Sequence, residues 1–333
     1  MHVPLWIWLA TIAGIIALLA LSFFTHVRKA HEPSLKEAGA WTAFFVSLAT
    51  AFGLGMTWVW GPTHGLEFFA GYITEYSLSV DNLFVFVIIM SSFAVPRADQ
   101  QTVLLVGIIV ALVLRTIFIL LGAAAIAHFS WVFYIFGLFL IITAAKLAFG
   151  SADESDEYQP NFMVRLIQKV LPVTDHYDGA KLTTLVDGKR HLTPMLMVML
   201  VIGFTDILFA LDSIPAIFGL TSEPYIVFAT NAFALLGLIE LYFLIGGLLG
   251  RLVYLSLGLA LVLAFIGVKL VLEAMHGNEL AFINGGQPIP WAPEISTTLS
   301  LIIILSILAV TTIASLIKNR FRKIPGVPDA AKR

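Results

Sequence analysis

The chain has no cysteine and few charged residues. Only 12% of its 333 residues are Asp, Glu, Lys or Arg, and 59% are hydrophobic, whereas a soluble domain has about 25% charged residues. The absence of cysteine excludes disulfides, thiolate metal sites and thiol chemistry. A net charge of −2 offers no basic surface to a nucleic acid. This composition is typical of a polytopic membrane protein whose main surrounding is the lipid bilayer.

Signatures of enzymes and nucleotide-driven pumps are also missing. The sequence contains no P-loop, no nucleophile elbow and no Gly-rich phosphate cradle, and its eight histidines are scattered without ligand spacing. We therefore expect no cofactor, no enzymatic activity and no ATP-driven transport by this chain alone.

Long apolar runs predict an all-α fold of about nine transmembrane helices. The windows fall near residues 4–27, 41–60, 66–95, 102–126, 130–150, 194–220, 225–249, 252–275 and 296–317. No basic residue precedes the first run, which is too long for a signal peptide, so we expect a retained helix. The window at 66–95 is too long for one straight span, which predicts a tilt, a kink or an interfacial part.

Lys and Arg occur in alternate connections, which predicts the orientation. The basic segments are those near 28–36, 97, 151–193 and 251, together with the tail at 318–333. The intervening connections have no Lys or Arg. The positive-inside rule then places the N-terminus outside and the C-terminus in the cytoplasm, as in a multi-pass protein of a bacterial inner membrane.

The predicted spans divide the chain into seven segments. They are an N-terminal helix with its basic connection (1–40), a second helix (41–65), a first three-helix unit (66–150), a cytoplasmic insert (151–193), a second three-helix unit (194–275), an outer loop with the last helix (276–317) and a basic tail (318–333).

The insert carries two structural patterns of its own. The stretch NFMVRLIQKVL (161–171) predicts a short interfacial amphipathic helix, and KLTTLVDGKRHL (181–192) predicts a β-hairpin with an Asp-Gly turn. The insert is mainly a structural element in this interpretation. It is also the surface through which the chain would form a homo-oligomer or bind a membrane partner.

Two polar stretches interrupt the apolar spans with the same pattern. TEYSLSVDNLF (74–84) and TDILFALDSIP (205–215) each contain Thr, an acid, five residues, Asp and a small polar residue. Their spans have opposite predicted directions, and each opens a three-helix unit. LRTIFILLG at 114–122 and LIELYFLIG at 238–246 correspond loosely in the second helix of each unit. This is the pattern of an inverted three-plus-three repeat, an architecture common among transporters.

The spacing of the two acids in each motif limits their geometry. Six helical steps turn the chain by about 240°, so Glu75 and Asp81 cannot share one face of a regular helix. Either each helix has two polar faces, or it unwinds between the acids, which is tolerated only beside a cavity or within protein. Pro215 favours a break in the span at 194–220.

Four acids inside the membrane predict a cation site. Each acid costs about 2.5–3.5 kcal/mol to insert, and the one clearly deep cation, Arg115, cannot neutralise four of them. The alternative is that the acids only form structural ion pairs. The expected ligands are Glu75, Asp81, Asn82, Asp206, Asp212 and Ser213, with Thr74, Ser79, Thr205, Arg115, Lys146, Lys269 and Glu240 in supporting positions. Glu240 could instead pair with Arg251.

Oxygen and amide ligands without cysteine or histidine suit Mg²⁺, Ca²⁺ or Mn²⁺. Clustered carboxylates also suit protons, because each raises the pKa of the other. The residues alone therefore indicate a hard divalent cation or a proton.

The motifs also support a family resemblance. EYSLSVDNLFVF, FTDILFALDSIPA and LPVTDHYDG, within roughly residues 40–320, resemble the TerC family of membrane proteins. The resemblance implies a link to tellurium resistance and to manganese export, with Mn²⁺ as the first-choice ion. Two positions depart from the pattern: Gly203 and Ile239 stand where many members have Glu and Arg, which implies that one ion pair is missing.

Three functions follow as hypotheses. The first is export of a hard divalent cation, Mn²⁺ before Ca²⁺, through a midplane site of acids from the two repeats, with protons as the coupling ion. The second is a membrane scaffold for a metal or tellurite stress response, in which the acids are locked in salt bridges. The third is export of a small organic cation.

The alternating basic connections give a direct test of the orientation. A reporter fused after Lys323 should be active on the cytoplasmic side, and one inserted within 276–295 should be active outside, because these segments differ in Lys and Arg content. The paired reporters act as controls for each other. If both reporters were active on the same side of the membrane, the prediction of nine spans would be contradicted.

Overall fold

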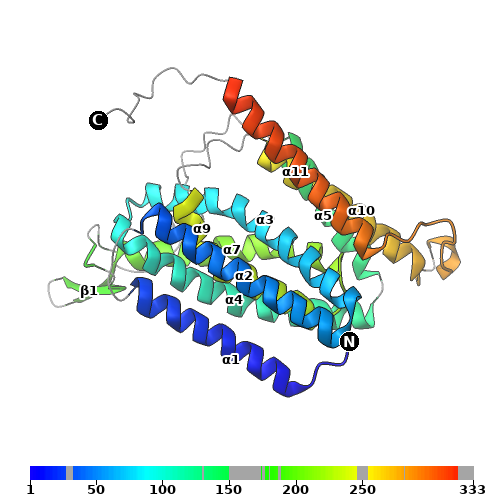
Figure 1. Ribbon diagram of the computed structural model, residues 1–333, viewed down its shortest axis with the longest axis horizontal. Helices are drawn as coiled ribbons and strands as arrows, with labels where there is room; N and C mark the ends of the chain where they lie inside the picture. The colour runs from blue at the N-terminus through cyan, green and yellow to red at the C-terminus, as the bar shows by residue number, and fades with distance from the viewer. Residues whose placement is uncertain are drawn as a thin grey trace.

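The computed structural model describes residues 1–27, 33–129, 131–149, 174, 177–179, 181–186, 189–245, 254–280 and 282–321. These residues are mostly helical (Figure 1). The helices are α1 (Leu5–Ser22) with a π-helical extension (Phe23–Val27), α2 (Leu35–Trp60), α3 (Pro62–Ser92), α4 (Arg97–His128), α5 (Val132–Phe149), α7 (Pro194–Phe218), α8 (Pro224–Leu236), α9 (Leu238–Ile245), α10 (Leu255–His276) and α11 (Thr297–Phe321).

The number of candidate membrane spans agrees with the prediction. Within the described residues, eight helices are long and apolar enough to cross a membrane, and the α8–α9 pair, bent by 40°, makes nine if it forms one broken span. The all-α polytopic class is therefore confirmed. Each helix overlaps the apolar window predicted for it, and the long window at 66–95 forms one unbroken helix, α3.

The predicted break at Pro215 is wrong. Helix α7 continues through Pro215 to Phe218, because a proline so close to the C-terminal end disturbs only the last turn. The next amide beyond the helix, that of Gly219, donates to the Pro215 carbonyl at 2.9 Å. The interrupted helix is instead the seventh span, at Gly237 between α8 and α9.

Local sequence explains where several helices begin. Helices α3, α7 and α8 each start at a proline, Pro62, Pro194 and Pro224, where the missing N–H has no intrahelical partner to lose. Helix α2 starts after Ser34, whose hydroxyl accepts a hydrogen bond from the Glu37 amide at 3.2 Å. Serine followed three residues later by glutamate is the sequence of a capping box.

Helices α3 and α7, which carry the two motifs, are antiparallel neighbours (Figure 1). Near the start of α3 and the end of α7, Thr221 donates to Glu67 at 2.8 Å. At the other end, Tyr177, which precedes α7 in the chain, donates to the carbonyl of Phe93 just after α3 at 2.7 Å. The motifs therefore run in opposite directions, as an inverted repeat requires.

Helix α1 packs on the outside of this arrangement. The Met1 ammonium forms an ion pair with Glu223, and the Thr11 hydroxyl lies 2.7 Å from the Tyr225 hydroxyl of α8. The N-terminus and the end of α11 at Phe321 lie at opposite ends of the bundle (Figure 1). An odd number of crossings gives this arrangement.

The predicted hairpin of the insert is present. Strands β1 (Thr183–Val186) and β2 (Lys189–Leu192) are antiparallel, with Thr183 opposite Leu192. Lys181 and Thr184 donate hydrogen bonds to Asp178 and hold the pKa of that carboxyl below its usual range. The turn at 187–188 and the predicted helix at 161–171 lie outside the described residues.

Helices α5 and α10 cross at two glycines. A Cβ added at Gly137 would lie 2.7 Å from the Gly267 carbonyl oxygen, and one added at Gly267 would lie 2.9 Å from the Gly137 carbonyl oxygen. Small residues allow this close helix contact in a membrane. The third helices of the two predicted repeats are thus locked together by backbone approach.

This crossing predicts a stability loss for Gly137→Ala or Gly267→Ala. Each methyl group would meet backbone atoms that cannot move independently, so we expect about 1–3 kcal/mol of destabilisation, measured by thermal unfolding in detergent. Gly14→Ala is the matched control, because no atom lies within 4 Å of a Cβ at Gly14. Equal melting temperatures for the three variants would show that the crossing is not tight.

Candidate functional site: acids around Arg115 and an adjoining cavity

The centre of the molecule contains one arginine bound by several polar side chains. Arg115 of α4 is 1% exposed, and its Nε and Nη2 donate to the two Asp206 oxygens at 3.0 and 3.1 Å. Its Nη1 donates to Glu75, to the Ser213 hydroxyl at 3.1 Å and to the Asn231 amide oxygen at 2.9 Å. We call these five residues the Arg115 cluster. The cluster joins α3, α4, α7 and α8 near the middle of α3, α4 and α7.

The Arg115 cluster does not balance its own charge. One guanidinium faces two carboxylates, Glu75 and Asp206, so the sum is +1 −2 = −1 when both are ionised. Oε2 of Glu75 is buried and accepts no hydrogen bond from the described part of the chain. An uncompensated charge at this depth is costly. The cluster therefore favours a further positive charge, either a proton or a cation.

The two acids of α7 lie on different faces of an unbroken helix. Asp206 faces α4 and Arg115, whereas Asp212 faces α5, where the Thr143 hydroxyl donates to it at 3.1 Å. Six residues of regular helix produce this divergence. Of the two geometries that the sequence allowed, two polar faces is therefore the one that α7 adopts.

Asp212 borders a small cavity between helices of the two predicted repeats. The cavity has a volume of about 180 Å³ and is lined by residues of α3, α5, α7 and α10. Its polar lining comes from Asn82, Thr143, Asp212 and Ser213, and its apolar lining from Leu78, Leu147, Phe209 and Leu263. We call it the inner cavity. Ser213 belongs both to this lining and to the Arg115 cluster, so the two features adjoin.

Other predicted site residues have more local roles. Ser79 donates to Glu75 at 3.3 Å. Thr205 donates to the Val201 carbonyl one turn earlier at 2.7 Å, which satisfies a hydroxyl within its own helix. The Thr74 hydroxyl is buried without a hydrogen-bond partner among the described residues.

The predicted metal-ligand set is only partly visible. Asp81 lies on α3, and its side chain is outside the described part of the structure. Among the residues that are described, no three His, Asp or Glu side chains gather closely enough to hold a metal ion. The set Glu75, Asp81, Asn82, Asp206, Asp212 and Ser213 thus stays a prediction. In it Glu75 and Asp206 bind Arg115, while Asn82 and Asp212 line the inner cavity.

The remaining supporting residues are spread over three helices. Lys146 is exposed on α5 and lies within electrostatic reach of Asp212. Lys269 is buried on α10 and lines a separate cavity near the end of α7. Glu240 is buried on α9, just after the bend at Gly237, and Arg251 lies outside the described residues.

Two residues of the site were missed from the sequence. Asn231 of α8 accepts from Arg115 and donates to the Val227 carbonyl at 2.9 Å, and Thr143 of α5 binds Asp212. An asparagine within the apolar run IVFATNAFALL is the signal that could have found the first. The hydroxyl of Thr143 gives no such signal, because membrane helices satisfy most Ser and Thr locally.

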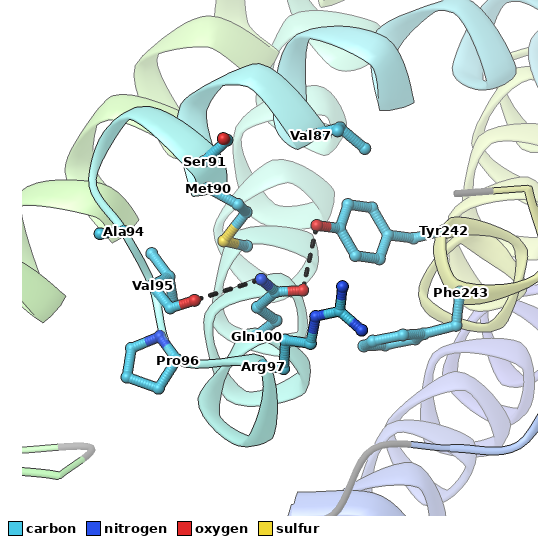
Figure 2. A pocket seen from close by; sticks show the side chains of 10 residues that line it. All are labelled: Val87, Met90, Ser91, Ala94, Val95, Pro96, Arg97, Gln100, Tyr242 and Phe243. Atoms are coloured by element: carbon cyan, nitrogen blue, oxygen red, sulfur yellow. Dashed lines mark hydrogen bonds between the residues drawn. The ribbon is translucent and has the colours of Figure 1, made fainter. Parts of the chain in front are cut away.

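A larger polar cavity lies at the N-terminal end of α4 (Figure 2). It has a volume of about 750 Å³ and is lined by the end of α3, the start of α4 and α9. Gln100 joins its walls, since it accepts from the Tyr242 hydroxyl at 3.1 Å and donates to the Val95 carbonyl at 3.2 Å. Gln100 and Arg115 are 15 residues apart, about 22 Å along a helix. This cavity is therefore separate from the Arg115 cluster.

Comparison with known proteins identifies the family. The family model described as integral membrane protein TerC family matches residues 60–323, which includes both acidic motifs, the Arg115 cluster and the inner cavity. The chain belongs to the TerC family of integral membrane proteins. No solved structure matches this TerC-family chain.

Several similar relatives cover nearly the whole chain. The uncharacterized membrane protein Rv2723 of Mycobacterium tuberculosis is 50% identical over 95% of this chain and 80% of its own length. The uncharacterized membrane protein STKORF319 of Myxococcus xanthus is 43% identical over 94% of this chain and 93% of its own. The putative membrane-bound redox modulator Alx of Escherichia coli is 39% identical over 84% and 89%.

The two departures from the family pattern lie in apolar surroundings. Ile239 is 3% exposed within an apolar cluster that also contains Leu235 and Val198. A Cβ added at Gly203 would lie 3.3 Å from a methyl group of Val110. At these two positions the TerC-family chain uses apolar packing, and the missing ion pair stays a prediction.

The Arg115 cluster predicts a large effect of Arg115→Met on stability. The variant leaves Glu75 and Asp206 buried without their cation, so we expect a loss of about 3–5 kcal/mol, measured by thermal unfolding in detergent. Adding Glu75→Gln and Asp206→Asn to the same variant should restore most of that loss, because no buried charge then remains. An Arg115→Met protein as stable as wild type would contradict the burial of this cluster.

Proposed function

We propose that this TerC-family protein exports a hard divalent cation, with Mn²⁺ as the first candidate, through the inner cavity. The observation that carries the proposal is the position of Asp212 on an oxygen-lined cavity between the two repeats, next to a buried cluster with net negative charge. Sites formed by opposed repeats near the midplane are a common arrangement in secondary transporters.

The chemistry of the inner cavity favours a hard ion. Its polar side chains are a carboxylate, an amide and two hydroxyls, from Asp212, Asn82, Thr143 and Ser213. These oxygen donors suit Mn²⁺, Ca²⁺ and Mg²⁺ better than Zn²⁺ or Cu⁺. The TerC resemblance puts Mn²⁺ before Ca²⁺.

The negative charge of the Arg115 cluster supports the same proposal. A cation in the inner cavity would lie close to Ser213, and therefore close to a cluster whose net charge is −1 when Glu75 and Asp206 are both ionised. Carboxylates must be ionised to bind a metal, so metal binding releases protons. Exchange of a divalent ion for protons at Asp212 and the cluster acids is the coupling that we infer.

The site supports the two alternative functions to different degrees. A small organic cation is disfavoured, because the inner cavity of about 180 Å³ is below the range of roughly 300–1,000 Å³ that is usual for organic ligands. A scaffold with structural acids is favoured by the Arg115 ion pairs to Glu75 and Asp206. It accounts less well for Asp212, which has a neutral hydroxyl as its hydrogen-bond donor and only a more distant, exposed base, Lys146, within electrostatic reach.

The Alx relatives carry the name membrane-bound redox modulator. A redox effect of this chain could not use thiols, because it has no cysteine. We infer that any such effect would follow from the metal content of the cell.

Asp212→Asn tests the transport proposal. The change keeps the size of the side chain and can keep a hydrogen bond to Thr143, but it removes the one carboxylate among the described residues that line the inner cavity. We expect manganese efflux from metal-loaded cells to fall at least about tenfold, while expression and melting temperature stay near wild type, because a buried neutral amide costs less than a buried carboxylate.

The matched control is Asp178→Asn, which makes the same change at an exposed acid of the insert. Efflux by the control should equal that of wild type. A folded Asp212→Asn protein that clears manganese at the wild-type rate would remove the inner cavity from transport. A loss of melting temperature without loss of efflux would favour the scaffold.

A further inference from the structure

A further polar cavity lies close to the end of α7, on the predicted outer side of the membrane. It has a volume of about 230 Å³ and is bounded by α3, α7, α10 and the start of α11. Its charged lining consists of Glu67, Lys269 and Glu273, and hydroxyls come from Thr221, Ser222, Ser296 and Thr297. We call it the outer cavity.

Lys269 is the unusual member of this lining. It is only 8% exposed, and among the described residues its ammonium forms no hydrogen bond and no ion pair within 4 Å. Glu273 and Glu67 both lie within electrostatic reach of it. The Lys269 ammonium is not among the fully enclosed polar atoms that lack a partner, so it faces the open space of the outer cavity. There the two carboxylates, and water or an ion, can stabilise its charge.

Glu67 is held in position for such a role. One of its oxygens accepts from the Thr221 hydroxyl at 2.8 Å and lies 3.1 Å from Nδ1 of His64. Its side chain is 14% exposed. This carboxylate is therefore fixed at the wall of the outer cavity, whereas Glu273 is exposed at the opposite side.

The outer and inner cavities lie along the same two helices. Leu263 of α10 lines the inner cavity and Lys269 lines the outer one, a separation of six residues or about 9 Å. Between them Ile266 is fully buried, and a Cβ added at Gly219, the residue after α7, would lie 2.5 Å from its Cγ2. Ile266, packed against Gly219, therefore lies on α10 between the residues that line the two cavities.

We propose that the outer cavity is a release site for the exported divalent cation, where the cation and the Lys269 ammonium alternate between Glu67 and Glu273. The two carboxylates attract a metal ion that has passed Ile266, and the tethered ammonium takes its place and expels it. An anion is excluded as the occupant, because the two carboxylates and one ammonium in the lining give the outer cavity a net charge of −1, which repels it. The assignment rests on the proposed export function, but its binding chemistry can be tested without transport.

The test uses the full-length protein in lipid nanodiscs, with Mn²⁺ binding followed by electron paramagnetic resonance. All variants carry Asp212→Asn, so that the inner cavity does not contribute. Lys269→Met removes the competing charge, and we expect Mn²⁺ to bind at least about tenfold more tightly, because a like charge this close in a partly buried site repels the cation strongly. Adding Glu67→Gln should abolish the gain.

Three further variants complete the design. Lys269→Arg keeps the charge and should bind like the parent, and Lys181→Met makes the same change at an exposed lysine and should have no effect. Glu273→Gln, at an exposed position that folding tolerates, should weaken Mn²⁺ binding severalfold.

The proposal is overturned by any of three results. These are no tightening in a folded Lys269→Met protein, tightening that survives Glu67→Gln, and unchanged binding in Glu273→Gln. Failure of export through Asp212 is a separate result, because these measurements contain no transport step and use the Asp212→Asn background throughout.

Discussion

The contact on which the rest of the structure depends is the bidentate pair between Arg115 and Asp206. Inside a bilayer neither group can be solvated, so each must find its partner within the protein. The same guanidinium binds Glu75, Ser213 and Asn231, and thereby sets the mutual positions of α3, α4, α7 and α8. Because α3 and α7 open the two repeats in opposite directions, this one side chain ties the halves of the molecule together at their centre.

The cluster also divides the acids into two kinds. Glu75 and Asp206 hold the arginine, and their excess negative charge acts on whatever lies beside Ser213. Asp212 points away from the arginine into a cavity bounded by hydroxyl, amide and apolar groups. A site that combined all these acids around one metal would not need an arginine. The arrangement instead suits the proposed cation, held by a few ligands of the inner cavity and attracted by the nearby acids of the Arg115 cluster. An ion held by few ligands can also leave.

Helix α10 packs closely against α5 and against the end of α7. Ile266 of α10 packs against Gly219, which follows α7, and α5 crosses α10 at Gly137 and Gly267, so the third helices of the two predicted repeats are in close contact. Small residues at these contacts allow the helix backbones to approach closely. The Thr143 hydroxyl of α5, which donates to Asp212 of α7, adds a polar contact between the same two groups of helices.

The sequence by itself determined the class, the spans and the repeated motifs, because twenty-residue apolar runs have one solution in a membrane and buried acids stand out against them. It also determined the hairpin at 183–192, since alternating residues around an Asp-Gly turn are a local signal. The helix break predicted at Pro215 from the local sequence was wrong, because a proline within the last turn of α7 does not interrupt the helix. Only the tertiary structure decided which acids bind Arg115, that Asn231 and Thr143 take part, and that Lys269 borders the outer cavity. These outcomes depend on which helix faces lie against each other, and helix packing, unlike hydropathy and turn chemistry, is set by contacts between residues far apart in the chain.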